Sequence, residues 1–187
     1  MTVLLGFVRH GVTEWNEAGR AQGQTDIELS DRGREQAKAL ASVLSAGAWD
    51  ALYTSDLSRA ADTAKLLAEH AALGEVKLDA RLRERSFGPL EGLTRKEQAE
   101  RWGENPLSAA GVERLEDVVT RGRSFVNDVT ARHSGQSVIA VSHGAFIRIM
   151  LAELLKQEAP DGWLDNATMT LVRYDGAAWK LLLYSVK

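Results

Sequence analysis

Two histidines, each followed by a glycine, stand at the ends of short apolar runs in this 187-residue chain. His10 follows the run over residues 3–8, and His143 follows the run over residues 138–141. Open parallel α/β sheets collect their reactive side chains just beyond the carboxyl ends of their strands. We therefore expect these two imidazoles, although remote in sequence, to meet at one site.

Two arginines accompany the histidines. Arg9 directly precedes His10, and Arg59 falls in the first turn of a helix that we expect to begin there. A cation at a helix N-terminus opposes the helix dipole, which indicates an anion bound between that terminus and the guanidinium. Guanidinium groups also match phosphate oxygens in bidentate pairs. Two guanidiniums and two imidazoles around one point predict a site for a phosphoryl group.

Taken alone, each of these residues has a plainer interpretation. A single histidine at a strand end is commonly structural, Arg59 is typical of a solvated surface charge, and Asn16 is typical of a turn or helix cap. His70 and His133 fall late in expected helices, where a cation suits the dipole, so we interpret both as surface residues. The coincidence of several such groups at strand ends favours the phosphoryl site.

A metal site is the main chemical alternative at this edge. His10 and His143 would supply two ligands, and Asp56, just after another expected strand, would supply a third. The neighbouring arginines disfavour it because they would repel a divalent cation. The chain has no cysteine, which excludes disulfides, thiolate metal sites and a cysteine nucleophile. We predict neither a metal nor another cofactor.

Hydrophobic spacing predicts the elements that position these residues. Short apolar runs indicate strands, and apolar positions three and four apart indicate helices. Strands are expected at residues 3–8, 51–54, 76–78, 137–141, 168–174 and 179–186, and helices at 30–45, 59–72, 94–102, 112–133 and 145–156. This alternation predicts one α/β domain over residues 1–187, with a mainly parallel central sheet, helices on both faces and an antiparallel edge.

Local signals mark several boundaries within that domain. Ser30 and Ser58 are expected N-caps of the first two helices, and Thr94 opens a capping-box pattern. Residues 175–176, Asp-Gly, predict a hairpin turn between the last two strands. Residues 81–110, between the third strand and the longest helix, are the natural place for a cap or substrate loop.

Composition limits the class of protein. Hydrophobic residues make up 44% of the chain, enough for a globular core, and the formal net charge is −3. That charge argues against nucleic acid or an anionic membrane as the main partner. The sequence shows neither an apolar run of roughly 18 residues nor the features of a signal peptide. We expect a cytoplasmic protein with a small-molecule substrate, whose last strand could pair with a second copy to form a homodimer.

Four motifs jointly resemble the histidine phosphatase superfamily, in its phosphatase branch alongside the phosphoglycerate mutases. They lie in the expected order at residues 9–16, 55–60, 84–92 and 142–144. Arg-His-Gly alone is a weak signal, but Arg-His-Gly-x-Thr-x-x-Asn followed by the other three is highly specific. The resemblance implies a phosphoglycerate-mutase-like fold and a cofactor-independent phosphatase acting on a small phosphomonoester.

The resemblance also implies a role for each matching residue. His10 would be the nucleophile and form phosphohistidine, while Arg9, Arg59 and His143 would hold the phosphoryl oxygens. A backbone acceptor should then hold the second ring nitrogen of His10. Glu84 would protonate the leaving alcohol and later activate water, although without the resemblance it is one charge on a solvated loop. The substrate-binding residues would be Asn16, Gln22, Gly23 and Gly144.

Departures from the family pattern bear on the reaction. The region after the third motif is short where the mutases carry basic insertions, and Phe87 stands where they commonly have tyrosine. Many phosphatases have Gly-Gly-Glu-Ser before the long helix, whereas residues 110–113 match only at Glu113. These differences favour hydrolysis, with a phosphoglycerate mutase or a non-catalytic phosphate-sensing module as alternatives. Trp15 and Trp102 join Phe87 as candidate apolar walls of the substrate site.

Overall fold

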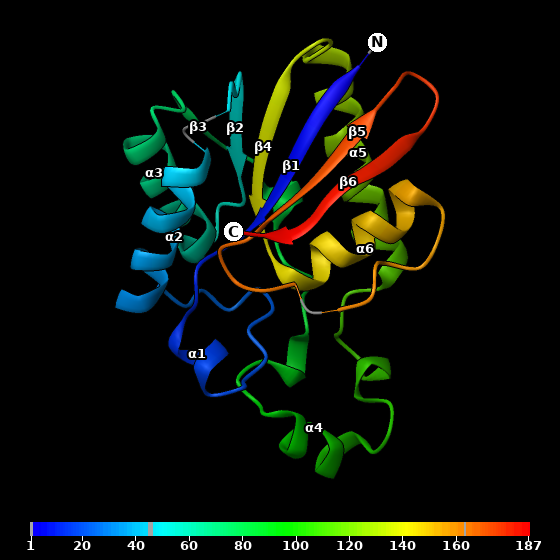
Figure 1. The fold of residues 1–187 in the computed structure, drawn as a ribbon. Coiled ribbons are helices and arrows are strands. Elements are labelled where there is room, and N and C mark those ends of the chain that lie inside the picture. The colour runs from blue at the N-terminus through cyan, green and yellow to red at the C-terminus, as the bar shows by residue number, and fades with distance from the viewer. Residues whose placement is uncertain (1, 45–46, 163) are drawn as a thin grey trace.

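A mixed six-stranded sheet forms the centre of the computed structural model, which describes residues 2–44, 47–162 and 164–187 (Figure 1). The strands are β1 (Val3–Arg9), β2 (Ala51–Thr54), β3 (Val76–Leu78), β4 (Ser137–Ser142), β5 (Met169–Tyr174) and β6 (Trp179–Val186). Their order across the sheet is β3-β2-β4-β1-β5-β6. The first four are parallel, β5 runs opposite to β1, and β6 runs opposite to β5. The predicted fold class, a mainly parallel sheet with an antiparallel edge, is confirmed.

The register of the two central strands decides where the histidines lie. Strand β1 pairs with β4 so that Val8 lies opposite Val141 and Arg9 lies opposite Ser142. The next backbone bond, from His10 N–H to the Ser142 carbonyl at 3.0 Å, continues this pairing past the end of β1. His10 and His143 therefore leave the sheet side by side, at the carboxyl ends of adjacent strands.

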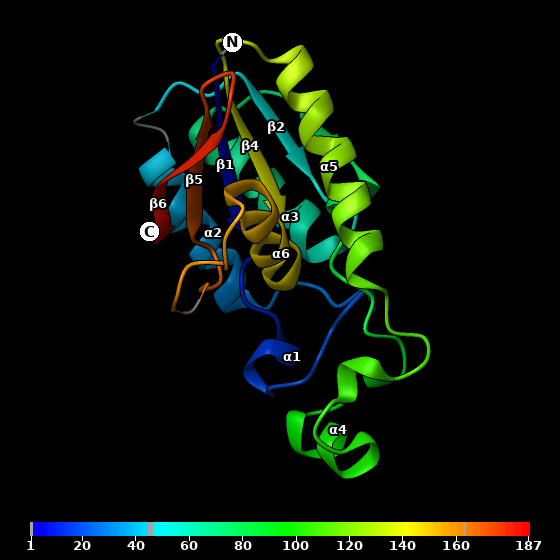
Figure 2. The same ribbon diagram turned by 90° about the vertical axis from the view of Figure 1, so that its right-hand side faces the viewer.

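Helices cover both faces of the sheet (Figure 2). They are α1 (Glu14–Glu17), α2 (Asp31–Leu44), α3 (Ser58–Ala71), α4 (Arg95–Trp102), α5 (Leu115–Arg132) and α6 (Gly144–Leu155). Helices α2 and α3 pack on the face that carries Val8 and Val141, whereas α5 and α6 pack on the opposite face, against Phe7 and Ala140. Both faces of β1 and β4 are buried, which explains their nearly continuous apolar sequences.

The first of the two long helices that follow β1 and β2 starts as predicted, whereas the second has a different N-cap. Helix α2 begins after Ser30 as predicted, with the Gly33 N–H donating to the Ser30 hydroxyl at 3.2 Å; the expected last residue, Ser45, lies outside the described residues. Ser58 is not the N-cap of α3, because the cap position is Leu57. The Asp26 carboxylate instead accepts the Ser58 N–H and hydroxyl, both at 2.8 Å. A distant carboxylate thus supplies the cap and an anion at this helix N-terminus.

The start of α5 and the position of His133 are the other corrections. Helix α5 begins at Leu115 and not at 112, because Glu113 N–H donates to the Ser86 carbonyl at 2.9 Å. His133 is buried, not a surface residue: its ring bonds Gln136 Oε1 at 2.7 Å and the Tyr53 hydroxyl at 3.0 Å. Neither contact is visible from helical spacing.

The segment over residues 81–110 extends beyond the carboxyl ends of the strands (Figures 1 and 2). Its main element is α4, and the capping box that opens α4 at Thr94 is present as predicted. Short 3₁₀ turns at Ala80–Leu82, Gly88–Leu90 and Pro106–Ser108 complete the segment. None of the helices in the described residues has the length and apolar character needed to cross a bilayer.

Candidate active site

His10 lies at the end of β1 with one ring nitrogen already engaged. Its side chain is 3% exposed, and Nδ1 lies 2.7 Å from the Gly11 carbonyl oxygen. A carbonyl only accepts, so this contact places the proton of a neutral ring on Nδ1 and leaves the lone pair on Nε2. The expected backbone acceptor is therefore present, and Nε2 is the nitrogen that can form a bond to phosphorus.

His143 faces His10 and differs from it in its hydrogen bonding. The two ring centroids are 5.1 Å apart, with an angle of 57° between the planes. His143 is the N-cap of α6 and is fully buried, yet neither of its nitrogens has a hydrogen-bond partner among the described residues. Buried polar groups are normally satisfied, so an unpaired ring here indicates a place for a ligand.

Two arginine nitrogens share this unsatisfied state. Arg9 Nε and Arg59 Nε are buried without a partner within the described part of the chain. Arg59 is completely buried on α3, so its interpretation as a surface charge is wrong. Its outer nitrogens donate to the carbonyls of Thr25 at 2.9 Å and Gly23 at 2.7 Å, and Arg9 Nη1 donates to the Leu164 carbonyl. Backbone carbonyls hold both guanidiniums in place, and each guanidinium keeps an N–H donor that can bind an anion. We refer to these donors and the two imidazoles as the phosphoryl socket.

Electrostatics favour neutral imidazoles in this socket. Burial, together with the positive charges of Arg59 and Arg9, lowers the pKa of His10 well below its ordinary value. Burial and Arg59 have the same effect on the pKa of His143. Burial also lowers the pKa values of the two arginines, but guanidinium stays protonated in proteins. At neutral pH the site therefore presents two positive charges beside the uncharged ring of His10.

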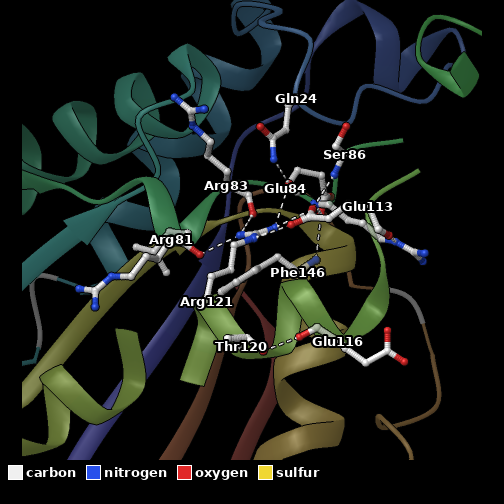
Figure 3. A network of polar contacts seen from close by, with 12 residues as sticks. Gln24, Arg81, Arg83, Glu84, Ser86, Glu113, Glu116, Thr120, Arg121 and Phe146 are labelled. Atoms are coloured by element: carbon white, nitrogen blue, oxygen red, sulfur yellow. Dashed lines mark hydrogen bonds and ion pairs between the residues drawn. The ribbon is translucent and has the colours of Figure 1, made fainter. Parts of the chain in front are cut away.

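Glu84 reaches the same edge from the 81–110 segment. Its side chain is buried, with only 8% of its surface exposed, so the solvated-loop interpretation is wrong. One carboxyl oxygen accepts the N–H of Phe146 at 2.8 Å (Figure 3) and of Arg85 at 2.9 Å. The other oxygen accepts the N–H of Ala145 at 3.0 Å. The carboxyl group is thus fixed at the N-terminus of α6, directly after His143.

Asn16 is oriented by contacts to its oxygen alone. The amide oxygen accepts the N–H and the hydroxyl of Thr13, both at 3.2 Å, and the amide of Asn166 at 3.3 Å. The plain interpretation is correct in part: Thr13 is the N-cap of α1, and Asn16 is the N3 residue that completes its capping box. These bonds do not use the Asn16 NH₂ group, so it can donate to a ligand as well.

Of the remaining predicted residues, Gly23 and Gly144 lie against the two arginines, and Gln22 is the neighbour of Gly23 in the chain. Gln22 is buried, and its oxygen has no partner in the described ranges. Gly23 has φ +54°, and an added Cβ would lie 2.0 Å from a Glu91 oxygen, so only glycine fits while its carbonyl anchors Arg59. Gly144 begins α6, where a Cβ would lie 3.4 Å from Arg9 Nε.

Two supporting residues were not predicted. Asn166 donates to the His10 carbonyl at 2.9 Å as well as to Asn16. Glu91 accepts the backbone N–H groups of Gln24 at 3.1 Å and Thr25 at 2.9 Å and so holds the loop that carries the carbonyls bound by Arg59. Asn166 precedes a strand and Glu91 lies in a turn, and neither has a sequence spacing that would single it out.

Asp56 is not available to the two histidines. Arg83 donates to its two oxygens at 2.7 and 2.5 Å, and this pairing lowers the pKa of Asp56. Within the described residues, no group of three or more histidine, aspartate or glutamate side chains is placed to hold a metal ion. The metal alternative thus lacks its third ligand.

Known proteins are similar to this chain in architecture and in sequence. A family model described as the histidine phosphatase superfamily (branch 1) matches residues 5–187. Phosphoserine phosphatase 1 of Hydrogenobacter thermophilus is 37% identical, over 92% of this chain and 87% of that protein. The metal-independent phosphoserine phosphatase of Arabidopsis thaliana is 36% identical, over 92% and 76%. A mycobacterial glucosyl-3-phosphoglycerate phosphatase, solved with VO3, superposes with a TM-score of 0.90 at 34% identity, over 98% and 99% of the chains. This chain belongs to the histidine phosphatase superfamily.

Proposed function

We propose that this protein is a phosphatase that hydrolyses small phosphomonoesters through a phosphohistidine on His10. The observation that carries the proposal is the arrangement of unsatisfied donors from Arg9, Arg59 and His143 beside a ring nitrogen that holds a free lone pair. Such a socket suits a phosphoryl group, and the three relatives described above, which match over nine-tenths of the chain, are phosphatases.

The first step transfers the phosphoryl group from the ester to the enzyme. A bond forms between His10 Nε2 and phosphorus while the bond from phosphorus to the ester oxygen breaks. Glu84 supplies the proton that the leaving alcohol takes. The two arginines and His143 stabilise the charge spread over the phosphoryl oxygens, and the Asn16 NH₂ group adds a neutral donor.

The second step returns the enzyme to its starting state. Glu84, now without its proton, removes one from water as the water oxygen attacks phosphorus. The bond to His10 Nε2 breaks, inorganic phosphate leaves, and Glu84 is protonated again. Neither step calls for a metal or another cofactor.

We propose that residues 81–110 act as a substrate cap within one domain over residues 1–187. The segment supplies Glu84 and extends over the strand ends. Trp15 packs against the cap, since a Cβ at Gly92 would lie 3.2 Å from its ring. Trp102 and Phe87 are the aromatic residues of the cap itself.

We also place the protein in the cytoplasm. We expect that two copies can pair through the outer strand β6 to form a homodimer, which light scattering would detect.

Release of inorganic phosphate from p-nitrophenyl phosphate and 3-phosphoglycerate, with and without a bisphosphate primer, tests the proposal. We expect release from at least the aryl ester without primer, and no change after treatment with EDTA. His10→Ala is expected to abolish release and to prevent ³²P labelling of the protein. Mutase activity without phosphate release, or loss of wild-type activity on chelation, would contradict the proposal.

A further inference from the structure

Arg121, on α5, uses all five of its N–H donors, and none of them points into the phosphoryl socket. Nε and Nη2 bind the two oxygens of Glu113 at 2.9 and 3.2 Å. Nη1 donates to the carbonyls of Arg81 at 2.8 Å and Arg83 at 2.6 Å, and Nη2 also donates to the carbonyl of Glu84 at 3.1 Å (Figure 3). Three carbonyls in a four-residue stretch thus converge on one guanidinium.

Glu113 extends this grip to the residues that follow Glu84. Its Oε2 accepts the N–H of Ser86 at 2.9 Å, and its own N–H donates to the Ser86 carbonyl at 2.9 Å. Its carbonyl accepts Nε of Arg85 at 2.8 Å. The Arg121–Glu113 pair therefore holds the backbone on both sides of Glu84.

Arg121 also contacts the helix residue that binds the Glu84 carboxyl. The guanidinium lies over the Phe146 ring, 5.1 Å from its centroid. The Phe146 N–H donates to Glu84 Oε1 at 2.8 Å. One partly buried side chain thus connects the backbone of Glu84 with the helix terminus that receives its carboxyl group.

A purely structural ion pair would not need this set of contacts. Arg81 shows the contrast, because its guanidinium binds Asp79 and Asp128 and no part of Glu84. The side chains of Arg121 and Glu113 are only 18% and 17% exposed, so their charges are largely removed from water. A lysine at position 121 would keep the charge but offer three donors in place of a rigid five-donor fork.

We propose that Arg121 is a positioning residue that sets where the Glu84 carboxyl meets the leaving oxygen. The inference rests on the proposed function, in which Glu84 is the proton donor. Proton transfer needs heavy atoms within about 2.6–3.2 Å, and a displacement of about 1 Å can cost on the order of 100-fold in rate. Loosening the stretch over residues 81–84 should therefore weaken proton donation without weakening the phosphate grip.

The leaving group separates this role from a structural one. Nitrophenolate can leave without receiving a proton, whereas an alkyl alcohol needs one. The parameter to measure is kcat/KM, because it depends only on the steps up to and including the first phosphoryl transfer. We expect Arg121→Lys to lower kcat/KM for glycerol 2-phosphate about 100-fold and for p-nitrophenyl phosphate less than about threefold. The inhibition constant of inorganic phosphate should change less than about twofold. Arg123→Lys is the matched control on the same helix, because Arg123 is exposed and binds Glu153. This variant should leave kcat/KM unchanged for both esters.

A double variant makes the test specific to Glu84. On a Glu84→Gln background, Arg121→Lys should add less than about twofold to the loss on the alkyl ester, because the donor is already gone. If Arg121→Lys does not fold by circular dichroism, Glu113→Gln takes its place, with the same selectivity expected. Equal losses on both esters, no loss on the alkyl ester, or independent losses in the double variant would overturn the role of Arg121. Wild-type protein that hydrolyses neither ester would instead contradict the proposed function itself.

Discussion

His10 makes a hydrogen bond from Nδ1 to a carbonyl, whereas His143, whose ring centroid lies 5.1 Å away, has no partner on either nitrogen among the described residues. This asymmetry separates two roles within one pair of imidazoles. A nucleophile needs a fixed tautomer, and His10 has one. A group that binds phosphoryl oxygens needs its N–H free until the substrate arrives, and His143 meets that condition.

Removing His143 should therefore weaken transition-state stabilisation without removing the nucleophile. We expect His143→Ala to lower kcat for p-nitrophenyl phosphate by about 100- to 1,000-fold, the usual loss when one charge-stabilising donor is deleted. The variant should still become labelled on His10 when quenched during turnover with a ³²P ester. His70→Ala, an exposed histidine on α3, is the control and should match wild type. Full activity in His143→Ala would contradict the assigned role.

Stability should fall as the pH falls below about 6.5, in part because of the buried histidines. In the unfolded chain a histidine has a pKa of about 6.5, whereas burial lowers the pKa values of His10 and His143 well below that in the folded protein. Below pH 6.5 the unfolded state binds protons that the folded state does not, so protonation favours unfolding. Each histidine should remove about 1 kcal/mol of unfolding free energy at pH 5.5.

Urea denaturation at pH 7.5 and pH 5.5 measures this effect. The pH-dependent loss should be about 1 kcal/mol smaller in His143→Gln than in wild type. Saturating inorganic phosphate should also reduce the loss in wild type, because a bound anion favours protonated imidazole. An equal loss of unfolding free energy in the variant and in wild type would show that His143 has the same pKa in the folded and the unfolded protein, and would contradict this prediction.

Asn166 should matter for phosphate affinity although it contacts the site only through Asn16 and the His10 carbonyl. Its amide donates to the Asn16 oxygen and to the His10 carbonyl, so Asn166→Ala removes one of the three bonds that orient the Asn16 side chain and lets its NH₂ group move more freely. We expect the inhibition constant of inorganic phosphate to rise about tenfold and the unfolding free energy to fall by about 1 kcal/mol. Asn127→Ala, an exposed position on α5, is the matched control. An unchanged inhibition constant would show that Asn16 needs no such support.

Glu91 should act through the loop that anchors Arg59. Its carboxylate accepts two backbone N–H groups from that loop, and Glu91→Gln replaces one acceptor oxygen with a donor. Burial opposes its ionisation, but the bonds from Thr25, Gln24 and Phe87 outweigh burial and lower the pKa of Glu91. We expect the variant to lose about 2 kcal/mol of stability and to lower kcat/KM equally for aryl and alkyl esters. A loss confined to alkyl esters would instead make Glu91 a proton donor.

The fold could be predicted because its signals are local. The apolar runs of β1 and β4 and the helical stripes of α2 and α6 repeat over neighbouring residues, and parallel topology then brings His10 and His143 to one edge. Glu84 was assigned its role by family resemblance, since its position among charged neighbours suggests an exposed loop. Its burial comes from the terminus of α6, some sixty residues further on.

The features that the sequence did not reveal depend on contacts between residues far apart in the chain. Asp26 caps α3 through two hydrogen bonds, and Asn166 holds the His10 carbonyl through one, and both join segments remote in sequence. Arg121 looks like one polar position on an amphipathic helix, although its partners are carbonyls of a distant segment. Backbone carbonyls carry no residue type, so a sequence contains no pattern that reveals such bonds.

The proposed proton donor, Glu84, and the proposed nucleophile, His10, are held in place by different elements. His10 is fixed in the sheet through β1, whereas the backbone of Glu84 is tied to α5 by the Arg121 guanidinium. Substitutions along that helix can shift the donor while the anion grip stays as it is. Evolution can therefore retune this chain toward esters of more or less acidic alcohols without altering how tightly it holds phosphate.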